Sequence, residues 1–202
     1  MRALIIVDVQ NDFVAGGALA VPRGEEVVGA INRIQPRFDV VVATRDWHPA
    51  DHGSFAATHG RAVGEMMELN GLPQMLWPVH CVQETAGAEL VAGLDMNRIE
   101  RVFDKGTEAG IDSYSGFFDN GHRRATGLGE YLKQKGVREV YVAGLATDYC
   151  VKATALDARQ LGFNTFLIED GSRGVELKAG DVSAAMEQMK QAGVKVVRSA
   201  EV

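Results

Sequence analysis

The chain has 202 residues, of which 46% are hydrophobic and 24% charged, a balance typical of globular proteins. Its formal net charge of −6 argues against a nucleic-acid partner, because such binding depends on clustered Lys and Arg. No stretch has the roughly 20 consecutive apolar residues of a membrane-spanning helix, so we expect no membrane partner. The length suits one domain, which we predict to cover residues 1–202.

Short apolar, β-branched segments recur along the chain and predict buried strands. In chain order they are residues 3–9, 39–44, 98–104, 139–144, 165–169 and 195–198. Segments with helical periodicity alternate with them, at residues 25–34, 127–135, 150–161 and 178–192. The alternation predicts an α/β fold in three α/β/α layers, around a mostly parallel, about six-stranded, Rossmann-like sheet.

Residues 47–96 interrupt this alternation with turn residues and few strand signals. A connection of this length is usually either functional or disordered. Its apolar content argues against disorder. We therefore predict an ordered excursion over the carboxyl ends of the strands, where open α/β sheets bind their ligands.

Four of the predicted strand ends each present a reactive side chain: Asp8, Asp46, Lys105 and Cys150. A charged residue at a single strand end is commonly a turn or cap residue. The carboxyl ends of parallel strands share one edge of the sheet, so these four groups are expected to converge. Their coincidence predicts a catalytic site.

Cys150 is the candidate nucleophile, because it opens a predicted helix whose N-terminus lowers a thiol pKa and offers N–H groups to an oxyanion. Asp8 is the candidate base, and Lys105 the cation that stabilises the thiolate. A free cysteine is more often a small buried apolar residue, an interpretation that suits Cys81 better. We expect both thiols to stay free in a reducing cytoplasm.

Asp46 and His48 are two residues apart, so on an extended strand their side chains share one face. With His80 they form a candidate site for Zn, with Fe or Mn as alternatives. His52 is either a fourth ligand, a residue behind the ligands or a solvent-facing residue. His59 and His122 are predicted surface residues.

Two other chemistries are not favoured by the sequence. Ser113, Ser115 and Ser172 lack the GxSxG pattern of a serine nucleophile. Gly16 and Gly17 lie outside any dinucleotide or P-loop pattern and are predicted to form a turn.

Seven segments of the chain form a recognisable set: LIIVDVQNDF (residues 4–13), TRDWHP (44–49), HGSFA (52–56), LWPVHC (76–81), DKG (104–106), DSYSGF (112–117) and GLATDYCV (144–151). Together they resemble the nicotinamidase/pyrazinamidase branch of the isochorismatase-like cysteine hydrolases. They occur in the order of that family. The two segments that contain Asp46-Trp47-His48 and Trp77-Pro78-Val79-His80-Cys81 are specific to this branch.

The resemblance implies a role for each candidate residue. The triad would be Asp8, Lys105 and Cys150, and the metal ligands would be Asp46, His48 and His80. The backbone N–H groups of Ala146 and Cys150 would form the oxyanion hole, next to a cis peptide between Ala146 and Thr147. Phe13, Trp77 and Tyr114 would wall the pocket around a flat aromatic ring whose nitrogen faces the metal.

The implied activity is hydrolysis of nicotinamide to nicotinate and ammonia through a cysteine thioester, in NAD salvage and pyridine nucleotide biosynthesis. Pyrazinamide is a second expected substrate, the expected location is cytoplasmic, and a homo-oligomer is left open. The nearest alternative is another cysteine amidase of the same superfamily, acting on a carbamoyl or ureido group without a metal. An isochorismatase is disfavoured by Cys150. A more distant alternative is a non-catalytic flavodoxin-like binding domain.

Overall fold

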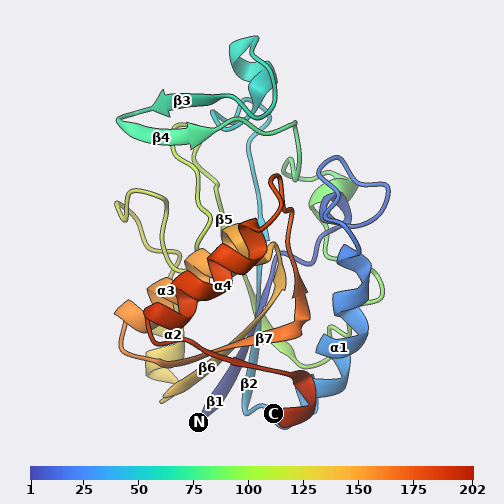
Figure 1. Ribbon diagram of the computed structural model, residues 1–202, viewed down its shortest axis with the longest axis vertical. Coiled ribbons are helices and arrows are strands. Elements are labelled where there is room, and N and C mark those ends of the chain that lie inside the picture. Colours follow the sequence, from blue (N-terminus) through green and yellow to red (C-terminus); the bar gives the residue numbers. More distant parts are fainter.

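A six-stranded parallel sheet forms the centre of the computed structural model, which describes residues 1–202 (Figure 1). The strands are β1 (Arg2–Val7), β2 (Val40–Asp46), β5 (Ile99–Lys105), β6 (Glu139–Leu145), β7 (Asn164–Arg173) and β8 (Lys195–Val197). Their order across the sheet is β5-β2-β1-β6-β7-β8, and every neighbouring pair is parallel. The predicted α/β sheet is confirmed.

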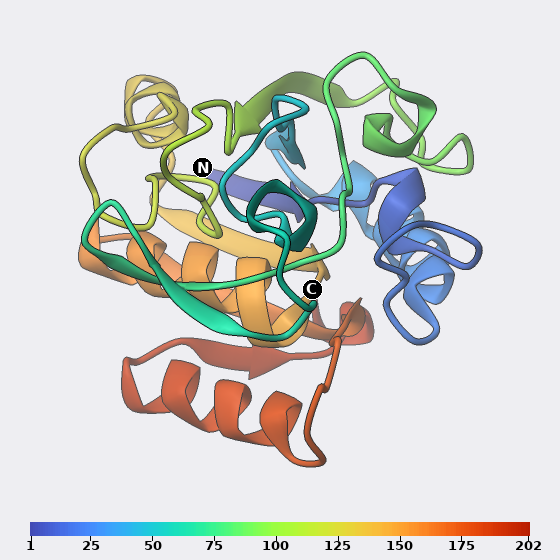
Figure 2. The same ribbon diagram turned by 90° about the horizontal axis from the view of Figure 1, so that it is seen from above.

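Helices cover both faces of the sheet, because residues of the central strand alternate between two cores. Leu4 and Ile6 of β1 pack in the core that holds Ile31 of α1 (Val27–Ile34). Ile5 and Val7 pack in the opposite core, with residues of three further helices. These helices are α2 (Leu128–Gln134), α3 (Lys152–Gln160) and α4 (Asp181–Gln191). The three layers are visible in Figure 2.

The excursion predicted at residues 47–96 lies over the carboxyl ends of the strands, and it contains a hairpin that the sequence analysis did not predict (Figure 1). Strands β3 (Met66–Leu69) and β4 (Leu72–Met75) pair antiparallel. Asn70 and Gly71 both have positive φ, +49° and +84°, and connect them. Asn-Gly is a strong signal for a two-residue hairpin. The strands on either side are short and half-exposed, so the sequence around Asn-Gly offers little support for predicting a hairpin.

The backbone around Cys150 differs from the prediction in two details. The predicted helix at residues 150–161 begins as a π-helical turn, Thr147–Val151, and only then continues as α3. The cis peptide bond lies between Leu145 and Ala146, so its predicted position one residue later was wrong. Both features belong to the connection that leaves β6.

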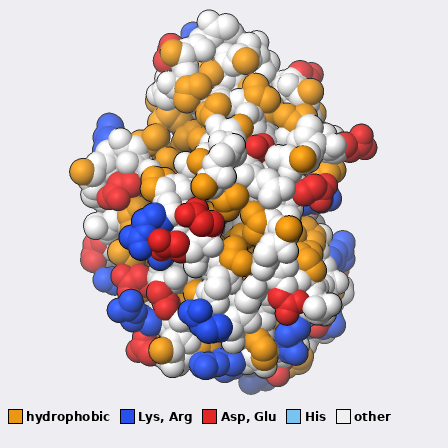
Figure 3. Space-filling model, turned by 90° about the vertical axis from the view of Figure 1, so that its right-hand side faces the viewer, with side chains coloured by type: hydrophobic (Ala, Val, Ile, Leu, Met, Phe, Trp, Pro, Cys, Tyr) orange, Lys and Arg blue, Asp and Glu red, His pale blue; other side chains and the backbone are white.

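The surface carries both signs of charge. On the face drawn in Figure 3, Lys and Arg side chains are interspersed with Asp and Glu and form no continuous basic patch. No helix of the structure combines the length and apolar character that crossing a bilayer demands.

The junction of β6 with β1 predicts a large effect of Gly144→Ala. A Cβ at Gly144 would lie 2.1 Å from the carbonyl oxygen of Val7, and the backbone there has φ +125°. Because neither strand can move without disturbing the buried sheet, we expect the free energy of unfolding to fall by about 3 kcal/mol or more in urea denaturation. Gly136→Ala is the control, since its φ is +74° but nothing lies within 4 Å of its Cβ. It should cost only about 1 kcal/mol; equal losses would contradict the packing argument.

Candidate active site

Lys105, at the end of β5, is the centre around which the predicted triad assembles. Its side chain is fully buried, and its Nζ lies 2.9 Å from Asp8 Oδ2 and 3.4 Å from Cys150 Sγ. The same Nζ contacts Asp46 Oδ1 and donates a hydrogen bond of 2.9 Å to the carbonyl oxygen of Ser113. Residues from four strand ends therefore meet at one ammonium group, as the sequence predicted.

Charge pairing outweighs burial for the lysine and one of its partners. Burial alone would lower the pKa of Lys105, but the carboxylates of Asp46 and Asp8 raise it well above its usual value. Burial alone would raise the pKa of Asp46, but Lys105 and the nearby imidazole of His48 hold it well below its usual range. Lys105 thus stays an ammonium and Asp46 a carboxylate near neutral pH.

Asp8 is the buried carboxylate whose protonation can change near neutral pH. Burial raises its pKa to about 6, although the charge of Lys105 opposes the shift. The hydroxyl of Thr44 donates a hydrogen bond of 2.7 Å to Asp8 Oδ1 and fixes the group. A base with a pKa close to the working pH combines availability with a driving force for proton transfer.

Cys150 is buried, and its thiol differs from the sequence-based expectation. Burial raises its pKa well above the usual value, although the charge of Lys105 lowers it. The lowering of the Cys150 pKa that we predicted from the helix N-terminus is outweighed by burial. The raised pKa favours the thiol form of Cys150, so as a nucleophile it would need a base. One oxygen of Asp8, one of Asp46 and Cys150 Sγ all lie within 4.8 Å of one another, so a base is at hand.

The three predicted metal ligands converge beside the triad. Asp46 Oδ2 lies 3.7 Å from His48 Nε2 and 3.8 Å from His80 Nε2. Each imidazole is oriented by its other nitrogen, since Nδ1 of His48 donates to the carbonyl oxygen of Gly106 and Nδ1 of His80 to that of Pro78, both at 2.8 Å. Two imidazoles and a carboxylate held in this way fit one divalent transition metal.

His52 is buried and packs against His48, with the ring centroids 4.1 Å apart and the rings tilted by 32°. Its Nδ1 lies 2.7 Å from the hydroxyl of Ser54 and its Nε2 lies 3.3 Å from the carbonyl oxygen of Ile111. Burial lowers its pKa to about 4, so the ring is neutral. The solvent-facing interpretation was wrong, and both ring nitrogens are occupied away from Asp46.

The remaining histidines lie outside the site. His59 is half-buried, with Nε2 2.8 Å from the carbonyl oxygen of Gly53, so its predicted surface position was only partly correct. His122 is exposed, as predicted, and its Nε2 lies 3.2 Å from Asp157 Oδ1.

A mainly apolar pocket opens onto Cys150 and two of the predicted metal ligands, Asp46 and His80. The predicted wall residues Phe13, Trp77 and Tyr114 all line it. Trp77 Nε1 donates a hydrogen bond of 3.1 Å to the hydroxyl of Tyr114, which fixes two walls relative to each other. The cavity between these walls has a volume of about 30 Å³, and Cys150 is buried beside it.

Sequence reasoning missed several residues of this pocket. Four are apolar or aromatic and complete its walls: Leu19, Val21, Tyr149 and Val175. The fifth, Asp112, is a buried carboxylate that accepts a hydrogen bond of 2.9 Å from Gln74 Nε2 of the unpredicted hairpin. Asp112 was recognised only as part of the motif at residues 112–117. It does not lie at a strand end, so no local signal indicated that it reaches the pocket.

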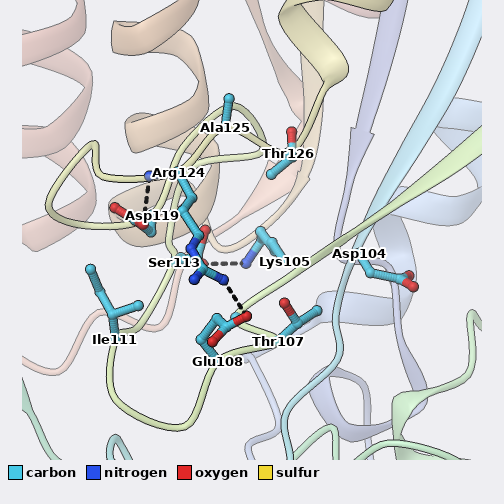
Figure 4. Close-up of a pocket in the computed structure, with 11 residues that line it drawn as sticks. Asp104, Lys105, Thr107, Glu108, Ile111, Ser113, Asp119, Arg124, Ala125 and Thr126 are labelled. Carbon is cyan, nitrogen blue, oxygen red and sulfur yellow. Dashed lines mark hydrogen bonds and ion pairs between the residues drawn. The ribbon is translucent and has the colours of Figure 1, made fainter.

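A second cavity, of about 300 Å³, adjoins Lys105 (Figure 4). It is polar, and an ion pair of 2.5 Å between Arg124 and Glu108 lies at its side. Lys105 points toward Ser113 in this view, and neither a cysteine nor a histidine lines the cavity. The candidate nucleophile Cys150 lines the apolar pocket instead.

Comparison with known families places these residues in context. The isochorismatase domain matches residues 2–201. The chain belongs to the isochorismatase family. Among relatives of this isochorismatase-family protein, a nicotinamidase of Escherichia coli is 50% identical over 196 residues, which cover 95% of this chain and 92% of the relative.

Two solved structures share its fold closely. A nicotinamidase and pyrazinamidase of Acinetobacter baumanii has a TM-score of 0.96 and 45% identity, covering 99% of this chain and 97% of its own. A pyrazinamidase of Pyrococcus horikoshii in complex with zinc has a TM-score of 0.80 and 40% identity, covering 98% of both chains. These matches confirm the isochorismatase-like resemblance and fold.

The convergent donors predict that this isochorismatase-family protein binds one divalent metal. His80→Ala should weaken Zn²⁺ binding by more than about 100-fold, since even residues behind the ligands account for about 10–100-fold. Competition with a chromophoric chelator measures the affinity. His122→Ala, which changes an exposed histidine, serves as the control. Similar affinities for the two variants would contradict the assignment of His80.

Proposed function

We propose that this chain is a nicotinamidase, an amidohydrolase that converts nicotinamide to nicotinate and ammonia. The observation that carries the proposal is the contact of one buried ammonium, Lys105, with both Asp8 and Cys150 beside an apolar pocket. The similarity to the Escherichia coli nicotinamidase supports the choice of substrate. The aromatic walls suit a flat ring, and Cys150 lies where the carboxamide of that ring would react.

In the first half of the proposed reaction, Asp8 takes the proton of the Cys150 thiol while the sulfur attacks the carboxamide carbon. The negative charge moves to the amide oxygen. The N–H of Ala146, which donates to no group of the protein, and the N–H of Cys150 would hold that oxygen. Asp8 then gives its proton to the departing nitrogen, the C–N bond breaks, and ammonia and a thioester remain.

In the second half, a water molecule attacks the thioester carbon and gives a proton to Asp8. The C–S bond breaks, nicotinic acid leaves and gives its proton to the released ammonia to become nicotinate, and Asp8 returns its own proton to Cys150. Lys105 stays charged throughout, because its raised pKa keeps its proton, and its field stabilises the sulfur whenever it is negative. Lys105 therefore orients and stabilises without exchanging protons.

Asp46, His48 and His80 would hold one divalent metal in this mechanism. Zinc is the first candidate, supported by the zinc complex of the Pyrococcus horikoshii pyrazinamidase, and Fe and Mn are the alternatives. When bound, the metal would act as a Lewis acid at the wall of the pocket and bind a ring nitrogen directly or through water.

The metal ligands and the apolar pocket separate this proposal from its nearest rival. An amidase of carbamoyl or ureido acids would use the same triad but would not need Asp46, His48 and His80 to converge. Pyrazinamide differs from nicotinamide only in its ring, and the pyrazinamidase names of similar proteins support it as a second substrate. A non-catalytic binding domain would not need any of these groups.

The wider setting is part of the same proposal. Nicotinate production implies a place in NAD salvage, and a mechanism that needs a free Cys150 suits a reducing cytoplasm. A single domain over residues 1–202 is supported by the one central sheet and by the family match to residues 2–201.

The nucleophile is tested by measuring ammonia release from nicotinamide. Cys150→Ala should lower kcat by at least about 10³-fold, because the covalent route is lost. Cys81→Ala is the matched control, since Cys81 is the other buried free thiol and does not line the pocket. Full activity of Cys150→Ala would disprove the mechanism, and ammonia release from a ureido acid instead of nicotinamide would favour the rival amidase.

The base is tested by the pH dependence of kcat/KM. Asp8 must be ionised to accept the thiol proton, so the rate should fall as the pH drops below about 6, the pKa that burial gives Asp8. Thr44→Val removes a hydrogen bond that favours the ionised form, and it should shift this acid limb to higher pH. An acid limb that does not move in Thr44→Val would exclude Asp8 as its origin.

A further inference from the structure

Gln10 is a fully buried glutamine that lies two residues beyond the proposed base and lines no part of the apolar pocket. Its side-chain amide is completely hydrogen-bonded. Nε2 donates to the main-chain carbonyl oxygens of Asp46 and Ala88, both at 2.8 Å. Oε1 accepts the main-chain N–H of Asp46, also at 2.8 Å. Two of the three bonds therefore hold the backbone of one residue, a proposed metal ligand.

The backbone of Asp46 needs this partner because the ladder between β1 and β2 ends before it. Val7 is paired in register with Thr44, and the N–H of Asp8 donates to the carbonyl oxygen of Thr44 at 3.2 Å. Asp8 then takes a positive φ of +50°, and the chain turns out of the sheet. The amide of Gln10 supplies the donor and the acceptor that the next residue of β1 would otherwise have provided.

On its other side, Asp46 is held by β5. It pairs in register with Lys105, and the N–H of Trp47 donates to the carbonyl oxygen of Lys105 at 2.9 Å. The backbone of Asp46 is thus fixed on both sides, by a strand and by a side chain.

The placement of this backbone decides what the carboxylate can reach. Oδ1 of Asp46 contacts Lys105, while Oδ2 faces the Nε2 atoms of His48 and His80. An aspartate side chain is short, so it serves both partners only from one backbone position. Ligands have to be held to within about 0.5 Å for a site to work.

We infer that Gln10 is a positioning residue for Asp46 and that the affinity of the site for a divalent metal depends on it. The inference rests on the proposed role of Asp46 as a metal ligand. Gln10 acts through the main chain of Asp46 and touches neither the metal donors nor the reacting sulfur. Residues that orient metal ligands commonly account for about 10–100-fold in affinity.

The test measures Zn²⁺ affinity by competition with a chromophoric chelator in the wild type, Gln10→Met and Gln10→Glu. Methionine keeps the volume and removes all three hydrogen bonds. Glutamate keeps the shape and an acceptor for the N–H of Asp46, but it places an oxygen against the carbonyl oxygens of Asp46 and Ala88. Both variants should bind Zn²⁺ about 10–100-fold more weakly. Having two variants keeps the test decisive if one of them does not fold.

Gln35→Met is the matched control. Gln35 is equally buried, and its Nε2 also donates to a main-chain carbonyl, that of Asp95 at 3.0 Å. It follows α1 and precedes β2, so it lies at the amino ends of the strands, far from the site. Gln35→Met should lose thermal stability as Gln10→Met does, but keep the wild-type affinity for Zn²⁺.

A kinetic readout separates positioning from general loss of structure. Excess Zn²⁺ should restore much of the nicotinamidase activity of Gln10→Met and leave that of Gln35→Met unchanged. If the wild type binds Zn²⁺ tightly but Gln10→Met and Gln35→Met have equal affinities, the inference about Gln10 is overturned and the proposed function is unaffected. A wild-type chain that binds no divalent metal would overturn the metal part of the proposed function, and the inference with it.

Discussion

The contact of one buried lysine with two carboxylates is the constraint on which the rest of the site depends. Burying an ammonium is costly unless opposite charges compensate for the lost water. Lys105 has Asp8 on one side and Asp46 on the other. In the proposed mechanism these two residues serve different functions, Asp8 in proton transfer and Asp46 in metal binding. The lysine therefore fixes the distance between the two halves of the site, and neither half can shift without leaving a charge unpaired.

The sheet explains how residues so far apart in the chain reach one lysine. β1, β2, β5 and β6 are parallel and adjacent, so their carboxyl ends lie on one edge, and the residues that follow them meet there. The excursion that follows β2 then returns over this edge and brings His80 and Trp77 to the same place. The parallel sheet brings the four strand ends together, and the long connection after β2 contributes His80 and Trp77 to the pocket.

Much of this arrangement could be predicted from the sequence, because strand ends and motifs leave local signals. Asp8, Asp46, Lys105 and Cys150 each follow an apolar segment, and the parallel sheet implies their meeting. The elevated thiol pKa could not be predicted, since it depends on how completely the surrounding residues bury Cys150. The position of Asp112 in the pocket was also missed, because this carboxylate is held by Gln74 from a hairpin of half-exposed strands.

The burial of Cys150 has a consequence for how fast its thiol is oxidised. Cysteine oxidation starts from a thiolate that solvent oxidants can reach. Cys150 is buried beside the aromatic walls of the pocket, and burial raises the pKa of its thiol, so both the access of peroxide and the thiolate form are restricted. The same walls that would select a flat ring therefore protect the sulfur, and a variant with smaller wall residues would lose its thiol faster in oxidising conditions.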